Sequence, residues 1–103
     1  MTVRYKAIEC RSGFTVSIQA SDTSYSIPRS NTAEKYSSVE LGFPNREEQL
    51  IMDWAEDPSV PTNTVYGYVP VEVVNLMIAK HGGIVSGTVP PGVTPLYCEE
   101  YEK

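Results

Sequence analysis

The residue types that most often do chemistry in proteins are few in this sequence. Its one histidine, His81, and its two cysteines, Cys10 and Cys98, stand far apart along the chain. A cysteine and a histidine can act as nucleophile and base, but no local signature surrounds these residues, and no side chain is recognisable as the group that would orient the base. One histidine and two distant cysteines also supply too few ligands for an ordinary zinc site. The sequence therefore predicts no catalytic residue, no metal site and no cofactor, and we expect a protein that is not an enzyme.

Carboxylates are unevenly distributed along the chain. The net charge is −5, with six Lys and Arg against four Asp and Glu in residues 1–46, and two against nine in residues 47–103. Duplex DNA attracts clustered cations, so this balance argues against direct binding to it. The acidic segment is instead suited to a basic protein partner. The predicted contact residues are Glu47, Glu48, Asp53, Trp54, Glu56 and Asp57. The alternative is a solvated acidic face that only aids solubility. Asp53, Glu56 and Asp57 could also be considered as calcium ligands, but the segment lacks the alternating oxygens and the turn glycine of a calcium loop.

A second hypothesis places a small ligand in the irregular stretch 21–38, which is rich in Ser, Thr, Asn and Asp and contains Pro28. Loops of this length are often functional or disordered. Tyr25, Arg29, Lys35 and Tyr36 would stack on a nucleotide and contact its phosphates. A structural virion component is a third alternative.

The elements that would position these residues are predicted from hydrophobic periodicity. Strands are expected at residues 2–8, 14–20, 39–43 and 64–69, the first two as a hairpin around Gly13. In the last of these, Tyr66 and Tyr68 would share one face. They would either pack on the second face of the sheet or form an aromatic recognition patch with Trp54. A short strand is possible over 84–89, and a final edge strand over 96–101.

The segment Val71–His81 is the best helix in the sequence. Pro70 suits its start, a broad apolar arc follows, and Gly82 and Gly83 suit a left-handed end. His81 falls in the last turn, where we expect it to cap open carbonyls. Residues 46–56 fit either a short second helix with Asn45 as its cap or a strand that alternates through Leu50, Met52 and Trp54.

Together these elements predict a single α+β domain over residues 1–103, a small antiparallel sheet packed by one main helix. No apolar run approaches the roughly 20 residues of a membrane-spanning helix, and the amino-terminal residues lead into no apolar signal core. We therefore expect no membrane partner, a cytoplasmic location and two free thiols at Cys10 and Cys98. The sequence does not indicate an oligomeric state.

The stretch 64–83, TVYGYVPVEVVNLMIAKHGG, together with SIQA at 17–20 and VELGFP at 39–44, resembles small uncharacterised accessory proteins of tailed bacteriophages. The resemblance contains no functional motif and transfers no catalytic residue. It implies a phage accessory protein in the host cytoplasm. Small acidic phage proteins of this kind resemble inhibitors of host defence, of the anti-CRISPR or anti-restriction kind, which act by binding. The resemblance therefore favours a non-catalytic inhibitor that docks its acidic surface onto a basic host protein.

Overall fold

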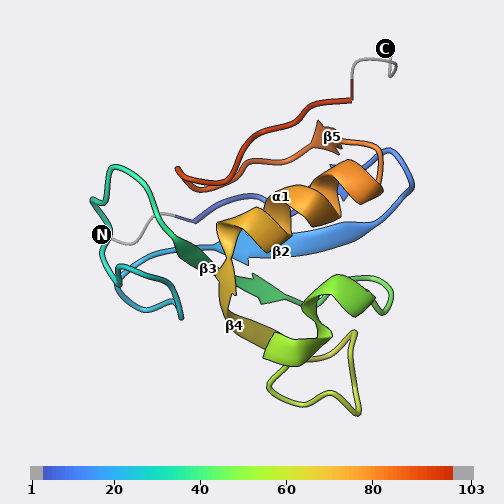
Figure 1. Cartoon of the computed structure of the whole chain (residues 1–103), viewed down its shortest axis with the longest axis horizontal. Coiled ribbons are helices and arrows are strands. Elements are labelled where there is room, and N and C mark those ends of the chain that lie inside the picture. Colours follow the sequence, from blue (N-terminus) through green and yellow to red (C-terminus); the bar gives the residue numbers. More distant parts are fainter. Residues whose placement is uncertain (1–3, 99–103) are drawn as a thin grey trace.

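The computed structural model describes residues 4–98 and forms a five-stranded antiparallel sheet packed by one main helix (Figure 1). The strands run in the order β4-β3-β2-β1-β5. In sequence order the elements are β1 (Ile8–Cys10), β2 (Thr15–Gln19), β3 (Ser38–Gly42), the 3₁₀ helix η1 (Gln49–Trp54), β4 (Val65–Pro70), α1 (Val71–Lys80) and β5 (Ile84–Ser86). The expected fold class is confirmed. No helix within residues 4–98 is long and apolar enough to cross a membrane.

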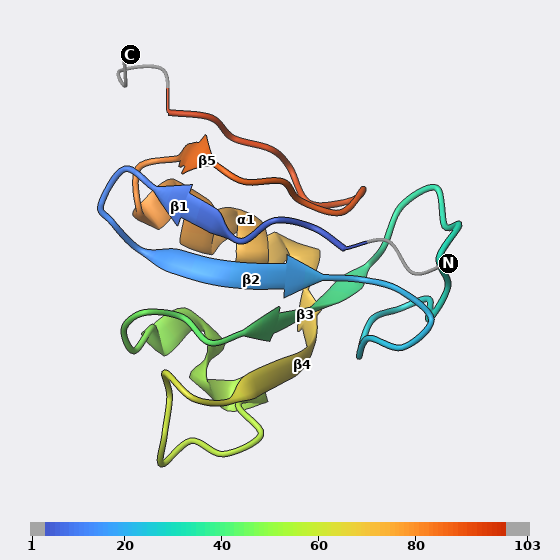
Figure 2. The same ribbon diagram turned by 180° about the vertical axis from the view of Figure 1, so that it is seen from behind.

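The hydrophobic core lies between α1 and one face of the sheet. Phe14, Val16 and Ile18 point into it from β2 and its approach, as their alternation predicts, and Val74 and Ile78 point into it from α1. All five side chains are buried. No helix of the described residues, 4–98, covers the opposite face of the sheet (Figure 2).

The helix α1 begins and ends as the sequence predicts. Pro70 precedes its first residue, and the chain leaves it through Gly82 and Gly83 at φ values of 89° and 92°. Gly83 N donates to Ile78 O, which satisfies a carbonyl of the last turn. This turn directs the chain into β5.

The first strand is displaced from its predicted position. The sequence predicts a strand over residues 2–8, but β1 occupies residues 8–10, and the described residues before it form no strand. The side chain of Gln19 explains the difference, because its Oε1 accepts from Tyr5 N and its Nε2 donates to Tyr5 O. An amide side chain thus takes the place of a backbone partner, and the regular ladder begins only at Ile8.

A β-bulge in β4 overturns the predicted aromatic face. Val39 pairs with Val69 and Leu41 with Tyr66, so β4 has one residue more than β3 between these pairs. The extra residue reverses the side-chain alternation. Tyr66 is fully buried, whereas Tyr68, at φ 57°, is exposed. Tyr66 and Tyr68 therefore do not form one patch with Trp54.

Of the two alternatives for residues 46–56, the structure shows a helix, the 3₁₀ helix η1 over Gln49–Trp54, which begins later than expected. Glu48, not Asn45, is the cap of η1, and its Oε2 accepts from Leu50 N at 2.9 Å. Asn45 instead holds the β1–β2 turn, since its Oδ1 accepts from Thr15 N and its Nδ2 donates to Gly13 O.

Other segments of the same chain lie along both edge strands of the sheet, β4 and β5. On the β4 side, Glu56 N donates to Val65 O and Ala55 bridges Tyr66. On the β5 side, Cys98 N donates to Ile84 O, and Tyr97 forms a single parallel bridge with Ile84. The rest of the final strand predicted over 96–101 lies beyond the described residues. Covered edges disfavour strand addition by another chain.

Candidate functional site

The helix η1 and the turns around it expose most of the predicted acidic surface at the β4 end of the molecule. Four of its carboxylates have exposed side chains, those of Glu47, Asp53, Glu56 and Asp57. Trp54 is only partly exposed. None of the four carboxylates forms an ion pair with a described cation. We call these four carboxylates the acidic end.

Asp57 is held in its ionised form by the loop that follows it. Its Oδ1 accepts hydrogen bonds from Ser59 Oγ and Ser59 N, which lower the pKa of this carboxyl. The side chain thus presents a negative charge near neutral pH.

Glu48 does not belong to this surface, which corrects the sequence-based assignment. Its residue exposure is 2%, and its carboxylate faces inward. Oε2 accepts from Leu50 N and from Lys80 Nζ at 2.7 Å, and Oε1 lies 2.6 Å from His81 Nε2. Burial alone would raise the pKa of Glu48, but the hydrogen bonds from Lys80, Leu50 and His81 lower it overall. Glu48 is therefore ionised and is not available to a partner.

His81 joins three segments that are distant in sequence. Its Nε2 meets Glu48 before η1, and its Nδ1 lies 2.8 Å from Ser12 Oγ in the β1–β2 turn. The ring is buried and stacks on Phe14, with centroids 4.2 Å apart and planes inclined by 10°. His81 does stand at the end of α1, as predicted, but its ring bonds side chains of two other segments.

The partners of His81 fix the direction of each hydrogen bond. The ionised Glu48 carboxylate can only accept, so His81 Nε2 must donate to it. In the neutral imidazole, Nδ1 then has no hydrogen and accepts from the hydroxyl of Ser12. The resulting order, hydroxyl to imidazole to carboxylate, is that of a serine nucleophile, its base and an orienting acid. Sequence analysis recognised no side chain that could orient His81, and the structure shows that Glu48 does so.

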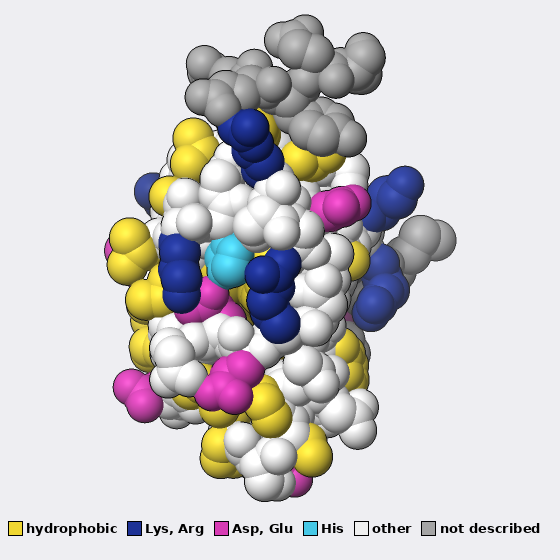
Figure 3. Space-filling view, turned by 90° about the vertical axis from the view of Figure 1, so that its right-hand side faces the viewer, with side chains coloured by type: hydrophobic (Ala, Val, Ile, Leu, Met, Phe, Trp, Pro, Cys, Tyr) yellow, Lys and Arg dark blue, Asp and Glu magenta, His cyan; other side chains and the backbone are white. Residues whose placement is uncertain are grey.

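The Ser12 turn is exposed and is bordered by basic side chains. Figure 3 shows the histidine flanked by Lys or Arg side chains, with carboxylates below it. Arg46 Nη2 donates to Ser12 O at 2.9 Å, and the guanidinium lies beside Gly13. Within the fold, the backbone N–H of Arg11 donates to Gly83 O, that of Ser12 to His81 O and that of Gly13 to Cys10 O. Phe14 N donates to Ser12 Oγ.

Sequence analysis missed this group because its members lie far apart in sequence. Glu48 precedes His81 by 33 residues, and Ser12 precedes it by 69. A partial signal was present, because a histidine directly before Gly82-Gly83 had to lie at a helix end. Nothing in the sequence identified which turn would meet it.

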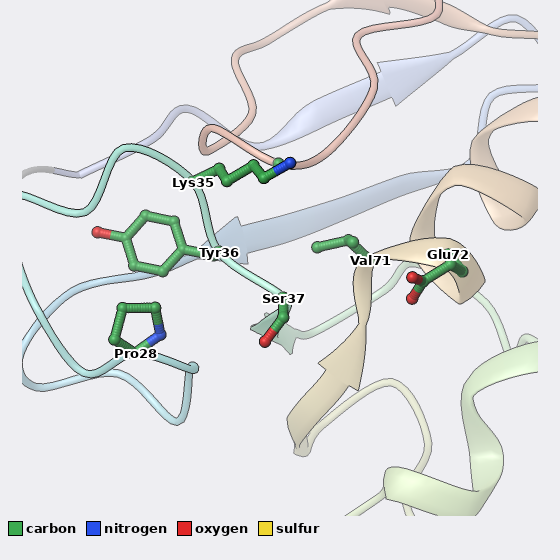
Figure 4. A pocket seen from close by; sticks show the side chains of 7 residues that line it. Pro28, Lys35, Tyr36, Ser37, Val71 and Glu72 are labelled. Carbon is green, nitrogen blue, oxygen red and sulfur yellow. The ribbon is translucent and has the colours of Figure 1, made fainter.

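The residues predicted to bind a nucleotide separate into two places. Lys35 and Tyr36 line a half-open cavity of about 360 Å³ between the 28–37 loop and the start of α1 (Figure 4). The other residues that line it are Pro28, Ser37, Val71, Glu72 and Gly92. Tyr36 is itself buried, with its hydroxyl bonded to Ser30 O, so its ring is not free to stack on a base.

Tyr25 and Arg29 do not line that cavity and instead contact each other. The Arg29 guanidinium carbon lies 5.6 Å from the centre of the Tyr25 ring, and the Tyr68 ring centre lies 5.7 Å from it. Tyr25 thus already has neighbours at its ring. The structure does not bring the four predicted ligand residues together.

No protein-family model, curated protein or solved structure matches this chain. Among residues 4–98, no group of three or more His, Cys, Asp or Glu side chains is placed to hold a metal ion. Both cysteines are free, Cys10 buried and Cys98 partly exposed.

Proposed function

We propose that the protein acts by binding a basic protein partner through its acidic end, and that its action on this partner is binding and not catalysis. The observation that supports this is the exposure of Glu47, Asp53, Glu56 and Asp57 on one short helix and its flanking turns, without a described cation to neutralise them. Unpaired carboxylates on one surface give a field that steers a basic partner and favours its docking.

The hydrogen bonds of Glu48 support this surface indirectly, because they fix the segment that carries it. Glu48 caps η1 and bonds both Lys80 and His81 at the end of α1. The segment that displays the acidic end is therefore fixed to the helix and the β1–β2 turn. A fixed segment loses less conformational entropy when it binds than a free loop would.

The resemblance to phage accessory proteins leads us to propose a setting for this binding. A basic partner in a bacterial host would be a protein that itself binds nucleic acid, such as a nuclease of a defence system. In this proposal the acidic end occupies the surface that the partner uses for phosphates, and the chain does not bind duplex DNA itself.

The test compares two variants of equal charge in capture from a bacterial lysate. In the first, the acidic end is neutralised by Glu47→Gln, Asp53→Asn, Glu56→Gln and Asp57→Asn. In the matched control, exposed carboxylates elsewhere are neutralised by Glu9→Gln, Asp22→Asn, Glu34→Gln and Glu72→Gln. We expect a protein captured by the wild type and the control but lost with the first variant. Equal capture by all three proteins, or no specific capture by the wild type, would refute the proposal.

A small-ligand function is a second candidate, favoured by the cavity beside Lys35 and Tyr36. Lys35 and Glu72 place opposite charges on its lining. Thermal-shift measurements with nucleotides and cyclic dinucleotides test this function, since a ligand at 100 times its dissociation constant stabilises the folded state by about 2.7 kcal/mol. No shift at millimolar ligand, or an equal shift in Lys35→Ala, would eliminate it.

A further inference from the structure

The hydroxyl of Ser12 differs chemically from the other exposed serine hydroxyls that the structure describes. It is exposed at the β1–β2 turn and lies 2.8 Å from a buried imidazole nitrogen. Ser59 offers a comparison, because its hydroxyl donates to the Asp57 carboxylate at 2.6 Å and has no imidazole beside it. Among side chains, imidazole is the one whose ordinary chemistry lets it both take and return a proton near neutral pH.

The imidazole is held in the orientation that a base requires. Stacking on Phe14 fixes the ring plane, and the bond from Nε2 to Glu48 leaves Nδ1 free of hydrogen in the neutral form. Phe14 N donates to Ser12 Oγ at 3.2 Å. The serine oxygen is therefore accepting from one side, which directs its own hydrogen toward Nδ1.

We propose that Ser12 is a nucleophile, with His81 as its base, that accepts an acyl group from small activated esters or thioesters. Ser12 Oγ forms a bond to the carbonyl carbon while its proton passes to His81 Nδ1. The tetrahedral intermediate then breaks the bond to the leaving oxygen or sulfur, which takes the proton from His81. Water, deprotonated by the same nitrogen, then forms a bond to the acyl carbon. The bond from that carbon to Ser12 Oγ breaks, the proton returns from His81 to Ser12 Oγ, and a carboxylic acid leaves. No metal ion or redox partner is needed for this sequence.

The surroundings of Ser12 set the class of substrate. Because the backbone N–H groups of Arg11, Ser12 and Gly13 are engaged within the fold, the negative oxygen of the intermediate must be met by a side chain. Arg46 is suited to this role, since its guanidinium already lies at Ser12 O and has further N–H donors. An exposed nucleophile with such modest stabilisation suits activated acyl donors and not amides.

The test is covalent labelling of the intact protein with a fluorophosphonate, followed by peptide mapping, together with release of p-nitrophenol from p-nitrophenyl acetate. Ser12 Oγ displaces fluoride from the probe's phosphorus, and the hydroxyl proton passes to His81. We expect one label, at Ser12, which Ser12→Ala abolishes, and a loss of about 100-fold in rate in His81→Gln, the size of a general-base contribution. Ser59→Ala is the control and should react like the wild type.

Peptide mapping of the label on the wild-type protein tests the proposal even if His81→Gln does not fold. A label confined to Ser12 supports the proposal. No label at Ser12, a label spread over the exposed serines, or unchanged reactivity in a folded His81→Gln would overturn it. This inference is independent of the binding proposal, because none of its residues belongs to the acidic end.

Discussion

At the scale of single residues, Glu48 is the buried charge that links η1 to the end of α1. Its carboxylate is almost fully buried, yet it meets donors from η1, from Lys80 and from His81. A buried charge is tolerated only when it is paired and hydrogen-bonded, and both conditions hold here. The residue therefore ties η1 to the end of α1 and is not part of the surface around it.

Replacing Glu48 should therefore be costly. Glu48→Ala leaves the His81 ring and Leu50 N without an acceptor inside the fold, and we expect a loss of about 3 kcal/mol in the free energy of unfolding. Urea denaturation followed by circular dichroism measures the change. Glu47→Ala, one residue away and exposed, should change stability by less than about 0.5 kcal/mol. Similar losses in the two variants would contradict this description of Glu48.

The same residue gives a directional pH dependence. The pKa of Glu48 is lower in the folded protein than its ordinary value of 4.5. Its contribution to stability is therefore complete above that value and is lost as the pH falls through the lower, folded pKa. Unfolding midpoints measured at decreasing pH should fall more steeply for the wild type than for Glu48→Gln. Parallel curves would show that this carboxyl does not contribute the dependence.

The two cysteines should differ in reactivity. Burial, with a smaller contribution from the charge of Glu9, raises the pKa of Cys10 to about 11, whereas Cys98 is partly exposed. Because the thiolate is the reactive form, iodoacetamide at pH 8 should modify Cys98 well before Cys10 in the native protein. Mass spectrometry of timed samples measures both rates. Equal rates in the native protein, or faster modification of Cys10, would contradict this prediction.

At the scale of elements, α1 and the sheet stabilise each other through one apolar interface. Val74 is completely buried, whereas Leu76, two residues on, is 58% exposed.

The outward-facing side of α1 also forms a contact, because Asn75 Oδ1 accepts a hydrogen bond from Thr94 N and so ties the helix to the 90–98 segment. Asn75→Ala, which helical periodicity alone would rate as silent, should cost about 1 kcal/mol.

A pair of aspartate substitutions tests this interface. Val74→Asp would bury an unpaired carboxylate, and we expect a loss of at least about 4 kcal/mol, comparable to the whole stability of a small domain. Leu76→Asp should leave the midpoint of thermal unfolding nearly unchanged. If Val74→Asp melts like the wild type, α1 does not pack as described.

At the scale of the whole molecule, local periodicity predicted the fold class but not the site. The helix α1 and strands β2, β3 and β4 follow from patterns within ten residues, so they were accessible from the sequence. The position of β1 was not, because it depends on the Gln19 side chain meeting Tyr5. The contact of Ser12, His81 and Glu48 depends on the packing of three distant segments, for which a single sequence contains no periodic signal.

The two proposed functional surfaces lie in different parts of the molecule. The acidic end lies on η1 and its turns, whereas Ser12 and its base lie at the junction of the β1–β2 turn with α1. Glu48 connects the two places through the protein interior. Binding and acyl transfer can therefore be tested with variants that do not overlap.

The central claim is that the acidic end binds a basic partner, and the salt dependence of that binding tests it most directly. The dissociation constant of the captured partner is measured by calorimetry from about 50 to 300 mM salt, where screening changes strongly. We predict that the dissociation constant rises steeply with salt for the wild type. The same rise is predicted for the control variant, in which Glu9, Asp22, Glu34 and Glu72 are replaced by their amides. The variant with the acidic end neutralised should bind weakly, with a flat dependence. Equal affinities and equal salt dependence in all three proteins would contradict the claim.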